Sequence, residues 1–530
     1  MSAGAPFVHH AAAAFFAVLW FADSDAAAAR TEAEQPAHHA AALYRQHCAT
    51  CHGADRLGGV GPALLPENLK RLRPKRAAAV IAEGLPATQM PAFGDRLEAG
   101  DIDALVELIY TPLAGIPEWD GLQIEASRIV HLEPTDDTRA RPAYDADPMN
   151  LFLVVESGDH HVTVLDGDRL EPIHRFKSRY ALHGGPKFSP DGRYAYLASR
   201  DGWVSKFDLY RLETVVETRA GINTRNVAVS GDGRYVMVAN YLPHTLVVLS
   251  ASDLTLERVI PVTDGKGGSS RVSAVYDAPP RQSFIAALRD VEEVWEIQYA
   301  DKPVYYGRVH DYRVEGPPEV TERFPVRRIE LDDYLDDFFF DPRYENLIGA
   351  ARNANNGQVV SLLVGRKIAD IDLTGLPHLG SGITWDYQGR PVVATPNLKK
   401  PELTVIEMGA WKVIKRIPTL GPGFFMRSHE NSRYAWADVF FGPDRDAVHV
   451  IDKATLEIVK TLRPEPGKTA AHVEFTRDGR YALLSIWDMD GAIVVYDAES
   501  LQEIKRLPMV KPSGKYNVYN KISGDRGTSH

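Results

Sequence analysis

Short apolar stretches that alternate with polar positions recur along the second part of the chain, at roughly forty-residue spacing. Three of these repeats contain the same turn, with Asp-Gly between two strand-like runs, at Phe188–Tyr194, Val229–Tyr235 and Phe475–Tyr481. Asp-Gly flanked by alternating apolar residues is a strong signal for a β-hairpin. Antiparallel hairpins repeated at this period predict a β-propeller.

Eight repeat units can be counted, so the fold expected for residues 148–522 is an all-β propeller with eight blades. The units begin near Pro148, His183, Arg225, Val272, Leu335, Leu379, Gly423 and His472. We expect a strand from the C-terminal segment Tyr516–Asn520 to complete the ring, because closure removes exposed sheet edges.

Before the repeats, the apolar residues follow a helical period. The predicted helices are Ala40–Gln46, Pro74–Glu83 and Asp101–Tyr110. They indicate a small all-α domain over residues 38–113. Residues 114–147 are rich in Pro, Asp and Thr without a helical period, so we expect a linker or a segment that wraps the propeller.

The N-terminal end carries an apolar run, Ala11–Ala22, that is too short to span a bilayer comfortably and is followed by small residues at Ala26–Ala29. This pattern predicts a secretory signal peptide over residues 1–29. The competing interpretations are a frayed apolar terminus and a misassigned start codon. Export predicts a periplasmic protein whose mature form has no membrane span.

The composition is that of a moderately acidic globular protein. The 530 residues include 71 acidic and 60 basic side chains, and the net charge is −11. Since no basic cluster stands out, the sequence argues against binding of a nucleic acid.

The two cysteines of the chain stand in Cys48-Ala49-Thr50-Cys51-His52. This spacing is the attachment signature of a c-type haem, in which both sulfurs bond the porphyrin and His52 ligates its iron. The alternatives are a structural disulfide, a zinc site and a chance match, but zinc requires further ligands. Gly61-Pro62 is placed to support the imidazole, and Met90 lies in a loop where its thioether is expected to be the sixth iron ligand.

The predicted inner strands of the propeller begin with a set of residues suited to chemistry at the mouth of the channel. The set comprises His183, Arg225, His378, His429 and His472. Of these, His429 is expected to be structural because it directly precedes a turn. Glycines follow His183, and we expect them to permit close approach of a flat macrocycle.

Four sequence segments carry a family resemblance, and they are Tyr180–His183, Arg200-Asp201, Pro377-His378 and Pro512–Asn520. With the haem c motif and eight repeats, they make the chain resemble the cytochrome cd1 nitrite reductase superfamily over nearly its whole mature length. The resemblance implies that the propeller binds haem d1, with His183 as the proximal iron ligand. It also implies that Arg200 and Arg225 pair with carboxylates of the macrocycle.

Two departures from the reductase pattern concern the distal side of haem d1. The segment that carries the first of two distal histidines reads Tyr334-Leu335-Asp336-Asp337 here, so that His378 alone remains. A tyrosine that precedes the cytochrome in the reductases is absent from residues 30–43. We further expect an ionised Asp336 to be a poor proton donor and to repel nitrite. The chain therefore resembles the biosynthetic branch of the superfamily.

The function implied is the last step of haem d1 synthesis, in which a propionate of dihydro-haem d1 becomes an acrylate. His378 and His472 are the expected bases, and haem c is expected to carry the electrons away. Expected partners are dihydro-haem d1, periplasmic electron-transfer proteins and a cytochrome cd1 nitrite reductase that accepts haem d1. The alternatives are a nitrite reductase and a carrier of haem d1 that catalyses no reaction.

Overall fold

The computed structural model describes residues 38–59, 61–70, 72–85, 90–132, 141–306, 320–350 and 356–523. The chain divides into two compact units, Met1–Ala114 and Gly115–His530. The predicted signal peptide, residues 1–29, lies outside the described residues. None of the helices in the described part of the chain is both long enough and apolar enough to cross a membrane.

The first unit is helical, in agreement with its apolar period. Residues 38–47 form a helix, which is followed by α2 (Ala49–His52), α3 (Pro66–Leu69), α4 (Pro74–Glu83) and α5 (Ala99–Tyr110). Glu98 and Asp101 cap the start of α5 reciprocally, each side chain accepting the backbone N–H of the other residue. The apolar faces of α4 and α5 pack into one core with Tyr44, which is buried.

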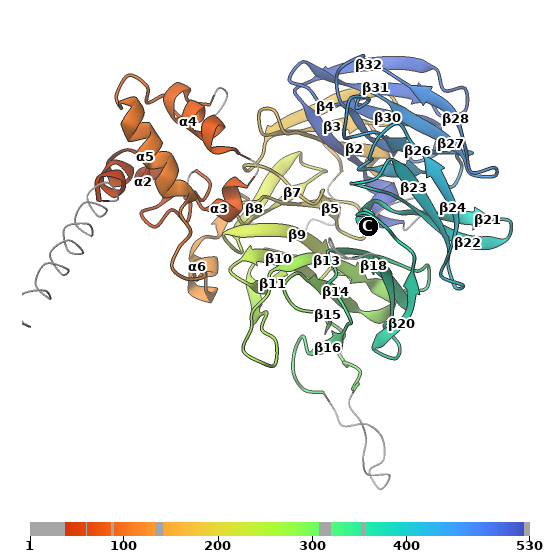
Figure 1. The fold of residues 1–530 in the computed structure, drawn as a ribbon, viewed down its shortest axis with the longest axis horizontal. Helices are drawn as coiled ribbons and strands as arrows, with labels where there is room; N and C mark the ends of the chain where they lie inside the picture. The colour runs from red at the N-terminus through yellow and green to blue at the C-terminus, as the bar shows by residue number, and fades with distance from the viewer. Residues whose placement is uncertain are drawn as a thin grey trace, which may run out of the picture. The chain divides into compact units, whose positions relative to one another are not determined.

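In the second unit the described residues form eight antiparallel sheets arranged around a ring, which confirms the predicted propeller (Figure 1). Short 3-10 helices lie between some of the strands, and they are η1 (Pro148–Asn150), η2 (Pro279–Arg281) and η3 (Leu379–Ser381). The first blade consists of β2 (Leu151–Glu156), β3 (His161–Asp166) and β4 (Glu171–Lys177) with β33 (Pro512–Asn517), and the second of β5 (Lys187–Phe188), β6 (Tyr194–Ala198), β7 (Trp203–Asp208) and β8 (Glu213–Arg219) with β1 (Ile129–Val130).

Each of the other six blades consists of four consecutive strands. The third to fifth blades are β9 (Asn223–Val229), β10 (Tyr235–Leu242), β11 (Thr245–Ser250) and β12 (Leu256–Pro261); β13 (Val272–Ala278), β14 (Ser283–Leu288), β15 (Glu293–Gln298) and β16 (Val326–Glu330); and β17 (Asp337–Phe340), β18 (Asn346–Ala350), β19 (Gly357–Ser361) and β20 (Arg366–Ile371). The sixth to eighth blades are β21 (Ile383–Tyr387), β22 (Arg390–Pro396), β23 (Glu402–Glu407) and β24 (Lys412–Pro418); β25 (Met426–Ser428), β26 (Tyr434–Asp438), β27 (Val448–Asp452) and β28 (Glu457–Leu462); and β29 (Ala470–Phe475), β30 (Tyr481–Ile486), β31 (Gly491–Asp497) and β32 (Glu503–Met509).

The repeated Asp-Gly turns join the first two strands of their blades. In each turn a hydroxyl donates a hydrogen bond to the turn aspartate, in the pairs Ser189 and Asp191, Ser230 and Asp232, and Thr476 and Asp478. The glycine that follows has a φ of 72° to 75°, at Gly192, Gly233 and Gly479. This left-handed backbone costs glycine little, so the short motif determines the turn.

The ring is closed by the C-terminal segment, although its bounds differ from those we predicted. β33 pairs with β2, with Lys515 opposite Val154, and ends at Asn517 rather than extending to Asn520. The helix α7 (Val518–Ile522) follows. The chain leaves the sheet here because the Asn517 side chain accepts the backbone N–H of Asn520 and caps the new helix.

The segment before the propeller packs against two blades, β5–β8 and β9–β12. It contains the short helix α6 (Gly121–Ala126) and the strand β1, which pairs with β8. We did not predict α6, because the segment has no helical period. The Trp119 indole N–H donates to the carbonyl of Arg219 at 2.8 Å, and the Arg219 guanidinium lies 4.5 Å from the centre of the indole ring. These contacts fasten the segment to the propeller edge.

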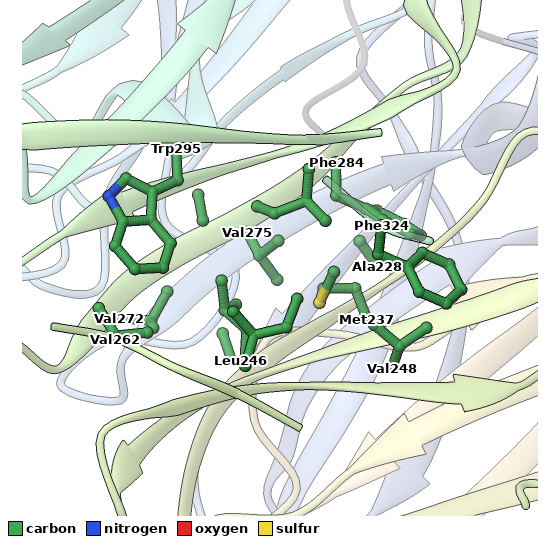
Figure 2. Close-up of a cluster of buried hydrophobic side chains, with 14 of the residues drawn as sticks. Ala228, Met237, Leu246, Val248, Val262, Val272, Val275, Phe284, Trp295 and Phe324 are labelled. Carbon is green, nitrogen blue, oxygen red and sulfur yellow. The ribbon is translucent and has the colours of Figure 1, made fainter. Parts of the chain in front are cut away.

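Apolar side chains fill the spaces between neighbouring blades. Figure 2 shows the cluster between β9–β12 and β13–β16, in which Met237, Phe284 and Trp295 are at most 1% exposed. Burial of one such side chain stabilises the fold by about 1.5–3 kcal/mol. This packing holds the blades against one another, and with them the strands and loops that carry the predicted site residues.

Candidate functional site

The haem c motif lies on a single helical turn. His52 donates its backbone N–H to the carbonyl of Cys48 at 2.9 Å, and Cys51 does so at 3.2 Å. The cysteines are three residues apart, and side chains at this spacing share one face of a helix. Both thiols are therefore presented together, as two bonds to one porphyrin require.

His52 is oriented as a haem ligand needs to be. Its Nδ1 donates to the carbonyl of Pro62 at 2.8 Å, which leaves Nε2 for the iron. A Cβ atom at Gly61 would lie 2.7 Å from His52 Cε1, so the glycine makes room for the ring. Burial lowers the pKa of His52 and favours the neutral imidazole, the form that binds metals. The residues present fit a haem c at this position.

Met90 lies at the edge of the same core, with its side chain partly buried against the apolar cluster. Its carbonyl accepts the backbone N–H of Leu85 at 3.1 Å. Residues 86–89 of this loop lie outside the described part of the chain. The role of Met90 as sixth ligand stays a prediction.

His183 lies in the loop before β5 and is held by two contacts with Arg225 of β9. Its Nδ1 donates to the Arg225 carbonyl at 2.6 Å, and Arg225 Nη1 lies 3.0 Å from Nε2 and 3.4 Å from Nδ1, over the face of the imidazole ring. The guanidinium is also anchored, because its Nε donates to the Ser273 carbonyl at 2.9 Å. These contacts fix the orientation of the His183 ring.

The glycines after His183 make room for side chains of the protein. A Cβ atom at Gly184 would lie 2.7 Å from the Cβ of Asn226, and one at Gly185 would lie 2.6 Å from a ring carbon of Tyr516. Both glycines have positive φ, 82° and 72°. Close approach of a macrocycle at these glycines stays a prediction.

The backbone of Arg200 is hydrogen-bonded to the loop that carries His183. Its N–H donates to the carbonyl of Ala181 at 3.1 Å, and its carbonyl accepts the N–H of Thr224 at 3.3 Å. These bonds connect the loop after β6 with the first strand of the next blade. Pairing of its guanidinium with a carboxylate of a ligand stays a prediction.

His378 immediately precedes η3 and has a defined tautomer. Its Nδ1 lies 2.6 Å from the carbonyl of Phe424, which can only accept, so Nδ1 carries the proton. The Phe424 ring lies 4.4 Å from the imidazole. Burial lowers the pKa of His378. A neutral imidazole with its lone pair on Nε2 can accept a proton or bind iron.

His472 lies at a β-bulge. β29 and β30 pair through Ala471 and Val473 and skip His472, which has a φ of 57°. A left-handed backbone is unfavourable for histidine, and bulges of this kind aim a side chain at a site. The ring lies 4.8 Å from that of Phe425 and 5.0 Å from that of Tyr516.

The tautomer of His472 is opposite to that of His378. The backbone N–H of Lys515 donates to His472 Nδ1 at 3.5 Å, so the neutral ring carries its proton on Nε2. Burial, followed by the nearby Lys515, lowers the pKa of His472 well below its usual value. His472 Nε2 is therefore a hydrogen-bond donor. This geometry favours His378 over His472 as a base.

Sequence reasoning missed several residues that the fold brings to these histidines. Tyr516, which the sequence predicts in a closing strand and in a family-like segment but not in the site, lies against Gly185 and His472. The rings of Phe424 and Phe425 lie 4.4 Å and 6.2 Å from the His378 ring. The resemblance of Pro512–Asn520 to the family could have pointed to Tyr516. No sequence pattern pointed to Phe424 or Phe425.

Asp336, which replaces a distal histidine in the resemblance, has a cationic partner. Its carboxylate lies 2.6 Å from Nη1 of Arg289. The neighbouring Asp337 accepts the hydroxyl of Tyr276 at 2.9 Å. Arg289 offsets the charge of Asp336, whereas Asp337 contacts a neutral hydroxyl, so repulsion of nitrite by this segment stays a prediction.

Comparison with protein families matches both units. Residues 146–314 and 318–521 match the family model described as "Cytochrome D1 heme domain". Residues 35–109 match the model described as "Cytochrome C oxidase, cbb3-type, subunit III". The two matches divide the chain as its two compact units do.

Individual relatives cover nearly the whole chain. The "Dihydro-heme d1 dehydrogenase" of Pseudomonas aeruginosa is 58% identical over 489 residues, 92% of this chain and 95% of that one. The "Nitrite reductase" of Stutzerimonas stutzeri is 25% identical and covers 96% of both chains. A solved structure, "Dihydro-heme d1 dehydrogenase NirN in complex with DHE", matches with 57% identity and a TM-score of 0.85, over 91% of this chain and 99% of that one.

Proposed function

We propose a function from the premise that the chain belongs to the cytochrome D1 haem domain family: it is an oxidoreductase of haem d1 biosynthesis that dehydrogenates dihydro-haem d1. The observation that carries the proposal is the 58% identity to a dihydro-haem d1 dehydrogenase, which extends over 92% of the chain. A solved structure of such an enzyme, described as a complex with DHE, has the same fold.

The reaction removes two electrons and two protons from a propionate side chain. The CH2–CH2 unit becomes CH=CH, and the new double bond is conjugated with the macrocycle. Haem c, when bound, takes up electrons one at a time. Cys48 and Cys51 would hold that haem, with His52 and Met90 at its iron. The protein has to hold the substrate and provide a proton acceptor.

His378 is the best-placed proton acceptor of the site. The hydrogen bond to Phe424 fixes its ring and leaves the Nε2 lone pair available. General base catalysis contributes about a hundredfold to ten-thousandfold to a rate. The same lone pair can instead bind the substrate iron, and the visible spectrum of the bound substrate distinguishes these roles. His472, with its proton on Nε2, would orient the substrate by donating a hydrogen bond.

His183 is the proposed proximal ligand of the substrate iron, and Arg225 is coupled to it. The Arg225 guanidinium lies over the face of the His183 ring, so it would be close to iron bound at Nε2. There it would pair with a carboxylate of the macrocycle, as a bidentate guanidinium suits. Arg200, beside the same loop, is the second proposed carboxylate partner.

We place the enzyme in the periplasm. The proposal is supported by the predicted signal peptide over residues 1–29 and by the haem c motif, because this haem is attached outside the cytoplasm in bacteria. Periplasmic electron-transfer proteins would then accept the electrons from haem c. A cytochrome cd1 nitrite reductase would receive the finished haem d1.

Incubation of the purified holoprotein with dihydro-haem d1 tests the function. We expect the visible spectrum to change as the double bond forms, and the mass of the extracted product to fall by two hydrogens. Nitrite turnover without this mass change would favour a nitrite reductase, the activity named for the 25% identical relative. Tight binding with neither reaction would favour a carrier.

A further inference from the structure

Asp438, at the end of β26, is a buried carboxylate whose oxygens bind backbone groups from two neighbouring segments. Its side chain is 1% exposed. Oδ1 accepts the N–H of Phe424 at 2.7 Å and that of Phe425 at 3.1 Å. Oδ2 accepts the N–H of His472 at 3.4 Å. One carboxylate therefore joins the loop before β25 to the bulge in β29.

Both proposed site histidines depend on the backbone that Asp438 holds. The carbonyl of Phe424 accepts the Nδ1 proton of His378, so it determines which nitrogen of His378 is free. The N–H of His472 that Asp438 accepts belongs to the residue with a left-handed backbone, and that conformation aims the His472 ring. The Phe425 ring contacts both imidazoles, with its centre 6.2 Å from that of His378 and 4.8 Å from that of His472.

We propose that Asp438 is a positioning residue for the dehydrogenation, which holds His378 and His472 in a single arrangement around the substrate. The inference rests on the proposed function. Three backbone donors converge on Asp438, and a carboxylate is the side chain able to accept them all. Other bonds hold the same loop, among them those from Asp438 N–H to the Phe425 carbonyl and from Gly423 N–H to the Asn397 carbonyl. Loss of the carboxylate should therefore disturb the histidines before it disturbs the fold.

The two variants Asp438→Asn and Asp438→Ala separate the two contacts. The amide oxygen of asparagine can still accept from the Phe424 loop, but its NH2 group faces the N–H of His472, and two donors repel. Alanine removes both contacts. Since a displacement of about 1 Å can reduce a rate by about a hundredfold, we expect kcat to fall by roughly tenfold in Asp438→Asn and by about a hundredfold in Asp438→Ala. KM for dihydro-haem d1 should change by less than about threefold, because these contacts bind no substrate directly.

The matched control is Asp452→Asn in the same blade. Asp452 is equally buried at the end of β27 and also accepts two backbone N–H groups, from Ala454 at 2.8 Å and Thr455 at 3.2 Å. It takes no part in the site, so its variant should retain the wild-type kcat. If Asp438→Ala fails to fold, as judged by its circular dichroism, Asp438→Asn carries the test.

The measurements are kcat, KM and the visible spectrum of bound dihydro-haem d1, made on holoprotein. Lower kcat with nearly unchanged KM in the Asp438 variants, together with an active Asp452→Asn, supports the inference. Wild-type kcat in folded Asp438→Asn and Asp438→Ala overturns it. If the wild-type protein itself does not convert dihydro-haem d1, the proposed function fails. The inference about Asp438 is then tested by the visible spectrum of bound dihydro-haem d1 alone. Identical spectra of wild type and Asp438→Ala overturn that inference as well.

Discussion

Replacement of His378 tests the chemistry of the site most directly. Nδ1 of this residue donates its proton to the Phe424 carbonyl, with 2.6 Å between nitrogen and oxygen, so the Nε2 lone pair is oriented before substrate binds. His378→Ala removes both nitrogens. His378→Asn removes Nε2 but keeps an N–H group close to the former Nδ1 position, where it can still donate to Phe424. Comparison of the two variants separates the reactive nitrogen from the structural one.

The expected losses of activity and of stability follow from these two nitrogens. Without a base, kcat should fall by about a hundredfold to ten-thousandfold, which corresponds to about 2.7–5.5 kcal/mol of activation free energy. In the alanine variant the partly buried Phe424 carbonyl also loses its donor, at a cost of about 1 kcal/mol in stability. The asparagine variant should show the same loss of kcat with a smaller loss of stability.

The assay follows formation of the acrylate by visible spectrum and by product mass, with thermal unfolding measured in parallel. A bound-substrate spectrum that is unchanged in His378→Asn identifies a proton acceptor, whereas an altered spectrum identifies an iron ligand. Recovery of wild-type kcat in His378→Asn would refute the reasoning, because the histidine would then serve only to hold Phe424.

Three further predictions concern haem c, stability and pH. Gly61→Ala places a Cβ atom 2.7 Å from His52 Cε1 and should alter the haem c spectrum and lower haem content; Gly100→Ala, whose Cβ atom meets nothing within 4 Å, should not, and equal spectra would contradict the proposed packing. Glu474→Gln weakens the buried ion pair between Glu474 and Arg427, whose charged atoms are 2.6 Å apart, and should lower the free energy of unfolding by about 3 kcal/mol. Urea unfolding measures this loss, and an unchanged midpoint would show that the ion pair does not stabilise the fold. Burial raises the pKa of Asp277 to about 8; because the unfolded chain releases this proton near pH 4, the folded state is favoured at low pH and loses stability as pH rises from about 4 to about 8. Asp277→Asn should therefore show a higher Tm than wild type at about pH 9, and a lower Tm there would show that the carboxylate is stabilising.

Local patterns in the sequence were enough to predict the architecture. The Asp-Gly turns at residues 188–194, 229–235 and 475–481 are closed by bonds between residues two to five positions apart, such as Ser230 to Asp232. The haem c motif is equally local, since one helical turn brings Cys48 and Cys51 to the same face. Interactions this short are encoded in consecutive residues, so the number of blades and the position of the haem c site could be predicted without a structure.

The arrangement of the candidate site was determined by the tertiary structure. The sequence suggested His378 and His472 as equivalent bases, but their tautomers are set by the Phe424 carbonyl and the Lys515 N–H, 46 and 43 residues away. The Asp438 carboxylate accepts the backbone N–H of His472, which lies 34 residues further along the chain. Such partners meet only when separate blades pack side by side in the closed ring, because a hydrogen bond depends on distance and direction in space. Residue type and spacing can therefore suggest a histidine, while the packed ring decides which of its nitrogens carries the proton.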